Sequence, residues 1–388
     1  MFRLATLMFC VFSITTGEFV VAGILPRVAA DLELTVGSAG LLVTAYAIGM
    51  IIGGPILTAL TAAADRKKLM QVLLLVAVVG NGVSALAPGF SLLLAARVLT
   101  ALVTSTFFAH AIVVAVNSRP SDQAASTVAR LVFGMNLAMI IGAPIGTVIG
   151  GQWGWRATFV AIGIACLIGL ALVSWLIETP RKETRTSAVA ELWVLRRRPV
   201  LLALSITAVG NIGALMVFSY LAPLLTGLAG HPLGRLPALL FAYGVGATIG
   251  NLIGGALYDR NPRLCQPLLL GLLAGCLIAT WFVASMPWPT VVAVVVIGAL
   301  AFSIIPGMQA RVMHSAAGAP TLSMAVNASG YQVAAACAGG LGGLITDSAA
   351  GPRPIYLVAA GLTVCGLLLT LTGPRTTQQS APEKVTNQ

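Results

Sequence analysis

Two charged residues, Glu18 and Arg97, stand inside otherwise apolar stretches of the sequence. Glu18 belongs to the polar segment 13–19 in the middle of an apolar run from about Leu4 to Leu25, which has about the 20 residues that a helix needs to cross a bilayer. An ionised carboxylate at the bilayer centre costs about 2.5 to 3.5 kcal/mol. We therefore expect Glu18 to take up and release a proton. The alternative is a carboxylate held permanently charged by a buried arginine or by backbone donors.

Further polar side chains fall inside apolar stretches and are candidates for lining a substrate cavity. Each is costly to bury without a partner, so each predicts either a wet cavity or a hydrogen bond between helices. The candidates are Tyr46, His110, Asn136, Asn211, Gln309, Asn327, Tyr331, Gln332 and Tyr243. These stretches hold no His, Cys, Asp and Glu cluster with catalytic or metal-ligand spacing, so we expect no enzyme, metal or cofactor. The six cysteines are predicted to be packing residues.

The composition identifies the elements that must position these side chains. With 58% hydrophobic residues, 9% charged residues and 42 glycines among 388 residues, the chain is expected to be an all-α membrane protein, not a soluble one. The net charge of +11 is spread over short loops, which favours membrane orientation over nucleic-acid binding. Twelve apolar spans are predicted, at about 4–26, 38–60, 69–87, 91–115, 125–149, 157–178, 200–222, 237–258, 266–286, 290–312, 323–346 and 355–373.

The basic residues predict the orientation of these spans. An even number of spans places both termini on one side, and with cytoplasmic termini the inner segments hold 17 basic residues against four in the outer loops. Arg97 is then the one basic residue assigned to neither side, because it lies within a span. The first segment has a central acid and no convincing cleavage site, so we interpret it as a span and not as a signal peptide.

The chain also predicts an internal repeat. The polar stretch 179–199 is expected to be a cytoplasmic linker between a six-helix bundle at 1–178 and another at 200–374, followed by a cytoplasmic tail at 375–388. A shift of 197 residues without gaps aligns Pro26 with Pro223 and matches further pairs, which are Ala45-Tyr46 with Ala242-Tyr243, Gly49 with Gly246, Gly53 with Gly250, Gly146 with Gly343 and Arg156 with Arg353. Parallel repeats of this kind bind substrate near the midplane between the halves.

The same shift places Leu215 opposite Glu18 and a valine opposite Arg97, so the proton chemistry is assigned to the N-terminal half. A second-half loop ends in Asp259-Arg260, which could pair across helices in one state or serve only as an orientation signal. The first-half counterpart keeps Arg66 but has Ala62 at the acidic position, which makes a latch there doubtful.

The fifth span carries Gly142, Pro144 and Gly146. Glycines four residues apart permit close helix contact, and proline favours a bend. We expect this helix to lie at the interface between the halves; ordinary small-residue packing is the alternative. Trp155 and Arg156, at the outer end of span six, are suited to the membrane interface.

These motifs together resemble the major facilitator superfamily. Thr16-Gly17-Glu18-Phe19 and the span-five glycine-proline motif resemble the twelve-span drug:proton antiporters, particularly the bacterial arabinose, purine-nucleoside and chloramphenicol exporters. The resemblance implies two pseudo-symmetric six-helix bundles in a bacterial inner membrane, acting as a monomer. It also implies alternating-access export of a small neutral or amphipathic compound, with Glu18 carrying the proton and Arg97 coupled to it. An uptake symporter or a facilitator of the same fold is the alternative.

Overall fold

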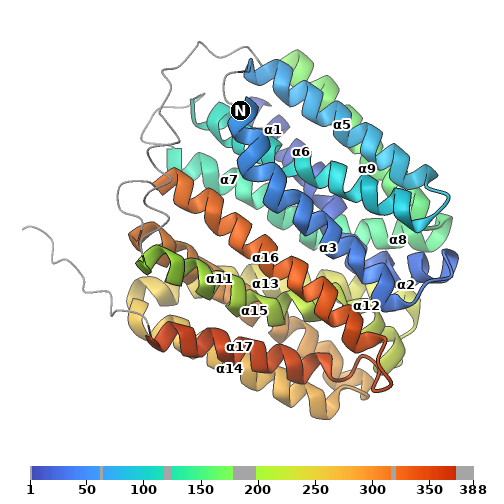
Figure 1. The fold of residues 1–388 in the computed structure, drawn as a ribbon, viewed down its shortest axis with the longest axis vertical. Coiled ribbons are helices and arrows are strands. Elements are labelled where there is room, and N and C mark those ends of the chain that lie inside the picture. The colour runs from blue at the N-terminus through green and yellow to red at the C-terminus, as the bar shows by residue number, and fades with distance from the viewer. Residues whose placement is uncertain (1, 62–63, 118–123, 178–197, 316–319, 373–388) are drawn as a thin grey trace, which may run out of the picture.

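The computed structural model describes residues 2–372 except 62–63, 118–123, 178–197 and 316–319, and the described residues form helices and no strand (Figure 1). The predicted linker 179–199 and tail 375–388 lie almost wholly outside the described residues. Ten helical segments are long and apolar enough to cross a membrane by length and composition, and α3 is a shorter apolar helix. With α16, which is 27 residues long, the described segments give the twelve predicted spans.

The N-terminal half contains spans one to six. They are α1 (Phe2–Phe19) with α2 (Val21–Asp31); α3 (Val36–Ile52) with the π-helical η1 (Gly53–Leu57) and α4 (Thr58–Thr61); α5 (Arg66–Leu86); α6 (Phe90–Asn117); α7 (Ala124–Leu137) with the π-helical η3 (Ala138–Gly142) and α8 (Ala143–Trp153); and α9 (Trp155–Leu176).

The C-terminal half contains spans seven to twelve. They are α11 (Arg198–Ser219) with α12 (Leu221–Pro223) and the π-helical η5 (Leu224–Leu228); η6 (Leu233–Arg235) with α13 (Leu236–Arg260); α14 (Pro262–Val283); α15 (Pro287–Ser315); α16 (Pro320–Thr346); and α17 (Ile355–Thr372).

The two halves repeat the same helix contacts. Gly49 of α3 packs against Val98 of α6, and its repeat partner Gly246 of α13 packs against Val295 of α15, which is itself 197 residues after Val98. The next glycine pair does the same, with Gly53 on Leu102 and Gly250 on Ala299. A side chain at any of these glycines would overlap the facing helix, because the backbones approach too closely for a Cβ atom. The sequence repeat is therefore a repeat of packing.

The first helix of each half is interrupted at a similar depth. The break between α1 and α2 falls at Val20, one residue after α1 ends, and the break between α11 and α12 falls at Tyr220. Each break precedes a proline, Pro26 or Pro223, which lacks the backbone donor of a regular helix. The interruption places Glu18 in the last turn of α1.

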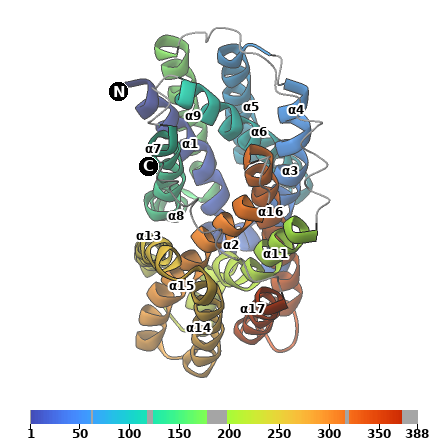
Figure 2. The same cartoon turned by 90° about the vertical axis from the view of Figure 1, so that its left-hand side faces the viewer.

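The halves meet mainly through α3 and α16, with further contacts between α13 and the segments η3 and α8, and between α2 and α12. Figure 2 shows the N-terminal half above the C-terminal half, with α16 passing along their junction. Glycines on both helices allow the approach of α3 to α16, because a Cβ on Gly37 or on Gly339 would overlap the opposite half.

A capping interaction closes the junction at the end of the bundle that carries the α2–α3 loop. Asp347, just after α16, accepts hydrogen bonds from Thr35 Oγ1 at 2.6 Å and from the backbone N–H of Gly37 at 2.9 Å. Thr35 is the N-cap of α3 and also accepts from the N–H of Ser38. A carboxylate at a helix N-terminus is stabilised by the unpaired N–H groups and the helix dipole. The C-terminal half thus caps a helix of the N-terminal half.

Asp31 ties the same end of the first span to the sixth. It forms an ion pair with Arg156 and accepts a hydrogen bond from Trp155 Nε1 at 3.0 Å. Trp155 is 3% exposed and packs edge to face on Phe159, so its ring faces the bundle, and its place at the depth of the membrane interface stays a prediction. The indole is buried because its N–H has a carboxylate partner within the bundle.

This cluster predicts a pH dependence of stability. Hydrogen bonds from Arg156 and Trp155 hold the pKa of Asp31 below its ordinary value. A depressed carboxyl pKa contributes stability that is present above the unfolded value of about 3.9 and is lost as the pH falls through the folded-state pKa. We expect Asp31→Asn to lower the thermal unfolding temperature in detergent at pH 7 by the equivalent of about 0.2 to 1 kcal/mol. This deficit should shrink below about pH 4.

The matched control is Glu33→Gln in the exposed α2–α3 loop, where Glu33 makes no ion pair with a described residue. That variant should follow the wild type at every pH. An Asp31→Asn deficit that stays constant down to pH 3 would contradict the assignment.

Candidate functional site at the junction of the two halves

Glu18 faces the opposite half of the protein. Gln332 of α16 donates a hydrogen bond from Nε2 to Glu18 Oε1 at 3.0 Å. Glu18 is half-buried and Gln332 is 7% exposed. Glu18, which the sequence places in the middle of an apolar span, therefore lies at the interface between the bundles. Its hydrogen-bond partner comes from the C-terminal half, which has no acid at the equivalent position.

Arg97 lies beside Glu18 without pairing with it. Its guanidinium carbon is 4.3 Å from the centroid of the Tyr46 ring and 5.8 Å from that of Phe159. A Cβ atom on Gly17, the residue before Glu18, would be 3.7 Å from Arg97 Nη1. Glu18 and Arg97 are both described and form no ion pair within 4.0 Å. A permanent charge pair between the two is therefore not formed in this conformation.

Aromatic rings from both halves surround this acid and base. Tyr46 is buried and donates its hydroxyl to Thr104 Oγ1 at 2.9 Å, so its ring is fixed beneath Arg97. Across the junction Phe19 meets Phe218 edge to face at 5.9 Å, and Phe218 in turn packs against Tyr243 at 5.1 Å. Aromatic rings of both halves therefore lie close to the acid at the junction.

The charge of Glu18 acts on groups from three other helices. They are Arg97 of α6, Tyr46 of α3 and Tyr331 of α16. Of the predicted cavity residues, the structure thus places Tyr46 and Tyr331 in the electrostatic range of Glu18 and Gln332 in hydrogen-bond contact with it.

The structure gives the other candidate residues different surroundings. Asn211 donates to Met308 Sδ at 3.1 Å, and Asn327 accepts from Thr207 Oγ1 at 2.7 Å. Both side chains therefore form hydrogen bonds between helices of the C-terminal half, which was the predicted alternative to lining a substrate cavity. Asn136 and Gln309 are half-buried and form no hydrogen bond with a described residue.

His110 is also held away from the acid. Its Nε2 lies 3.3 Å from Thr61 Oγ1 of α4, and the positive charge of Arg66, in the first turn of α5, acts on its ring. The predicted contact of His110 with substrate has no support in this geometry.

The glycines of the fifth span pack within one half and not across the junction. A Cβ on Gly142 would overlap Thr16 of α1, and one on Gly146 would overlap Val20. The fifth span nevertheless lies at the junction as expected, because η3 and α8 contact α13, with Ile140 against Gly244. The glycine stripe itself packs against α1, as in the alternative of small-residue packing. The π-helical turn Ala138–Gly142 directly precedes Pro144, in keeping with the predicted irregularity.

Two polar residues near the predicted motifs were missed. Asp65 caps α5 by accepting a hydrogen bond from the N–H of Lys68 at 2.9 Å, and it directly precedes Arg66. The loop between spans two and three therefore carries an acidic and a basic residue in sequence, as the second half does. Asn81 of α5 is 4% exposed, and its Oδ1 has no hydrogen-bond partner and lies 4.0 Å from the position of a Cβ on Gly17. Asp259 and Arg260 are exposed and form no ion pair with described residues.

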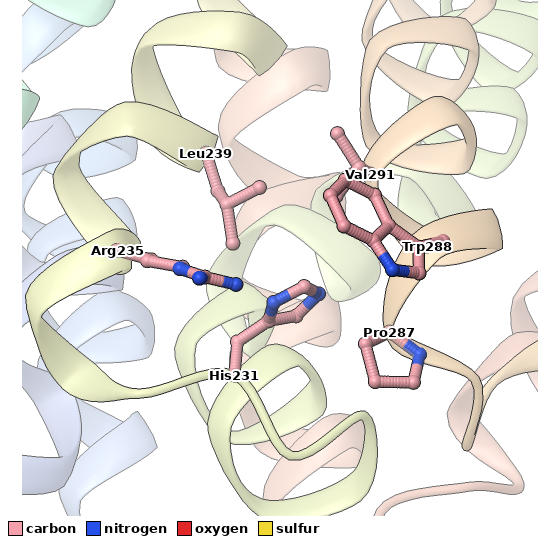
Figure 3. A pocket seen from close by; sticks show the side chains of 6 residues that line it. All are labelled: His231, Arg235, Leu239, Pro287, Trp288 and Val291. Atoms are coloured by element: carbon pink, nitrogen blue, oxygen red, sulfur yellow. The ribbon is translucent and has the colours of Figure 1, made fainter.

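A separate pocket of about 310 Å³ lies in the C-terminal half near the starts of α13 and α15 (Figure 3). His231, Arg235, Leu239, Pro287, Trp288 and Val291 line it. The imidazole of His231 is buried and lies 3.0 Å from Thr290 Oγ1. None of the lining residues belongs to the cluster around Glu18, so this pocket is distinct from the candidate site.

Two six-helix bundles that meet around an acid at membrane depth define a multi-pass membrane transporter built from two repeats. The sequence model of the Major Facilitator Superfamily matches residues 7–323, and the chain belongs to that family. The family resemblance read from the motifs is confirmed.

Its relatives include bacterial proteins named as transporters and a resistance protein. The chain is 35% identical to an uncharacterized MFS-type transporter, YtbD of Bacillus subtilis, over 93% of this chain and 92% of that protein. It is 34% identical to the inner membrane transport protein YdhP of Escherichia coli K12, over 93% and 92%. It is 33% identical to a chloramphenicol resistance protein of Streptomyces lividans, over 83% of each chain.

The fold matches a solved structure as well. A bacterial homologue of the human lysosomal transporter Spinster, in an inward-facing and occupied conformation, superposes with a TM-score of 0.78 over 98% of both chains at 15% identity. At that identity the similarity concerns the fold alone.

Proposed function

We propose that this protein is a proton-coupled exporter of a small neutral or amphipathic compound, working by alternating access. The observation that carries the proposal is the position of Glu18, which is at membrane depth, at the junction of the halves, and hydrogen-bonded to Gln332 of the opposite half. An acid in this position changes its surroundings whenever the halves move. The proposed setting is a bacterial inner membrane, with both termini cytoplasmic, one chain as the working unit and no cofactor or catalytic step.

The conformation described here represents one end of the proposed cycle. With cytoplasmic termini, the α2–α3 loop lies outside, so the contacts of Asp347 with Thr35 and Gly37 close the outer end. Opening that end requires α3 to part from α16, which also separates Glu18 from Gln332. Substrate would bind between the aromatic groups of the two halves and leave outward, while Glu18 takes a proton from outside and releases it inside.

Arg97 completes the proposed mechanism. A cation that lies near Glu18 but is not bonded to it favours the ionised acid without trapping it. A membrane potential of 100 mV contributes about 2.3 kcal/mol for each charge moved, so one proton can support a substrate gradient of about fiftyfold.

The proposal is tested by substrate-induced proton flux in proteoliposomes. Chloramphenicol is the first probe because a 33% identical relative is a chloramphenicol resistance protein, and neutral sugars and nucleosides complete the panel. We expect one compound to drive proton movement in the wild type and in Glu33→Gln, and to drive none in Glu18→Gln. Loop residue Glu33 is exposed, so its variant controls for the loss of a carboxylate.

Three outcomes would overturn the proposal. Equal proton coupling in wild type and Glu18→Gln would make Glu18 structural. Transport of a compound down its gradient with no proton movement in any variant would identify a facilitator, and proton movement in the same direction as the solute would identify a symporter.

A further inference from the structure

The side-chain amide of Gln332 uses only one of its two polar groups. Its Nε2 donates to Glu18 Oε1 at 3.0 Å, while its Oε1 is buried and has no hydrogen-bond partner among the described residues. Gln332 is 7% exposed and comes from α16, the helix that makes most of the contact with α3 across the junction. A buried acceptor without a partner, next to an ionisable acid, calls for a functional explanation.

The N–H and C=O groups of the Gln332 amide match the two protonation states of Glu18. An ionised carboxylate only accepts hydrogen bonds, whereas a protonated carboxyl also carries one O–H donor. The Nε2–H of Gln332 therefore serves the ionised form of Glu18, and the unused Oε1 of the same amide is an acceptor for the O–H of the protonated form. Hydrogen bonds to a charged group are roughly twice as strong as neutral ones, so this amide favours the ionised acid.

We propose that Gln332 is the positioning residue that promotes proton release from Glu18 while the α2–α3 end is closed. The inference rests on the proposed function and adds which conformation takes up the proton and which releases it. When the end opens, α16 withdraws the Nε2–H donor from α1, and Glu18 binds a proton more readily; when the end closes, the donor returns and the proton leaves. The half without an acid thereby contributes the group that decides when the acid ionises.

The surroundings of Glu18 leave this role to Gln332. The charged group that acts on Glu18 is Arg97 of α6, and the titratable groups on which the charge of Glu18 acts in turn are Tyr46 of α3 and Tyr331 of α16. The hydroxyl of Tyr46 is already donated to Thr104, and Arg97 forms no ion pair with Glu18. The fifth span packs against α1 with glycines, and the thiol of Cys166 in α9 acts on Cys10, eight residues before Glu18. Among the described residues, the hydrogen bond to Glu18 is the one from Gln332.

The test measures protonation of Glu18 directly and needs no substrate. Purified protein in detergent is titrated while infrared difference spectroscopy records the C=O stretching band of protonated carboxyls, and the band that disappears in Glu18→Gln is assigned to Glu18. Gln332→Met keeps the length of the side chain but removes both polar groups. We expect its Glu18 band to persist to higher pH, with a midpoint shifted upward by about one pH unit or more.

Gln266→Met is the matched control. Gln266 of α14 is 5% exposed, donates from Nε2 to the backbone O of Ile304 at 3.3 Å, and has a buried Oε1 without a partner, yet it lies within one half and faces no acid. Its variant loses the same kind of buried amide and should leave the midpoint unchanged. Gln332→Leu provides a second amide-free variant if Gln332→Met does not elute as a folded monomer.

The outcomes separate this inference from the proposed function. A Glu18 band that titrates with the same midpoint in wild type and in the Gln332 variants overturns the role of Gln332 and leaves the proton mechanism standing. The absence of any titrating band that depends on Glu18 overturns the proton mechanism itself. An equal shift in Gln266→Met would show that loss of a buried amide acts through the fold, which also overturns the inference.

Discussion

Arg97→Met is expected to reduce proton-coupled transport by at least about tenfold while leaving the protein at least as stable as the wild type. Arg97 is 1% exposed, its buried Nε has no hydrogen-bond partner, and its guanidinium forms no ion pair with a described residue. A buried charge without an ion-pair partner costs several kcal/mol, and the contacts with Tyr46 and Phe159 offset about 0.5 to 2 kcal/mol of that cost. Methionine fills the same space and packs well against aromatic rings, so thermal unfolding in detergent should not shift downward.

The expected loss of transport has an electrostatic cause. The attraction between opposite charges falls only in proportion to their separation. At an effective dielectric constant of about 20, charges beyond ion-pair distance therefore still attract each other by on the order of 1 to 2 kcal/mol, which corresponds to about tenfold in an equilibrium. Without the cation of Arg97, ionised Glu18 loses that support and stays protonated in the closed state. Substrate-driven proton flux in proteoliposomes should therefore fall by at least about tenfold.

Arg156→Met is the matched control because the two arginines differ in what they bind. Arg156 pairs with Asp31 and donates to the backbone O of Ala87 at 3.1 Å. Its loss should lower the unfolding temperature and preserve proton coupling, which is the reverse of the pattern for Arg97. A strongly reduced unfolding temperature for Arg97→Met would instead mean that Arg97 has a structural role.

The repeat was the most informative part of the sequence. The ungapped shift of 197 residues paired Gly49 with Gly246. The structure shows the two glycines packed against equivalent positions, Val98 of α6 and Val295 of α15. Close helix packing requires the absence of a side chain, so it leaves a direct mark on the sequence. The depth of Glu18 was predictable for a similar reason, because a charge inside an apolar span is rare.

The ungapped shift also caused the main omission. The counterpart of Asp259-Arg260 is Asp65-Arg66, which stands three residues later than the shift places it. The extra residues fall in the second span, which contains the π-helical segment η1 and ends in the short helix α4 before the loop, whereas α13 continues without a break to Arg260. A change in helical geometry inserts residues without changing the order of motifs, and a fixed offset misses it.

The partners of the polar residues were beyond the reach of the sequence. Asn327, Tyr331 and Gln332 lie within six residues of each other on α16, yet Asn327 bonds to Thr207 inside its own half and Gln332 bonds to Glu18 in the other. Helical periodicity assigns residues to faces but does not say which helix a face meets. The same limit explains the fifth span, where the glycine stripe was identified but its partner, α1, was not.

The close packing of Gly142 against Thr16 positions the part of α1 that carries Glu18. We expect Gly142→Ala to disrupt this packing. The new Cβ would overlap Thr16 Oγ1 and would lie 2.9 Å from Thr16 Cγ2, so α1 must move away from the fifth span. Overpacking of this kind costs about 1 to 3 kcal/mol. Thr16 is two residues before Glu18, and a displacement of about 1 Å at a functional group can reduce a rate about a hundredfold. We expect lower thermal stability and at least a tenfold loss of proton-coupled transport.

A second substitution tests the steric cause. Thr16→Ala removes Oγ1 and Cγ2, whose one hydrogen bond goes to the backbone O of Phe12 in the same helix, and leaves a Cβ 3.1 Å from the new methyl group. The double variant Gly142→Ala with Thr16→Ala should recover most of the lost stability and transport. Gly271→Ala on α14, where no heavy atom lies within 4 Å of the added Cβ, should instead stabilise the protein by about 0.5 to 1 kcal/mol. If the double variant is as impaired as Gly142→Ala alone, then contact with Thr16 is not what positions Glu18, and the flexibility of the glycine itself is required.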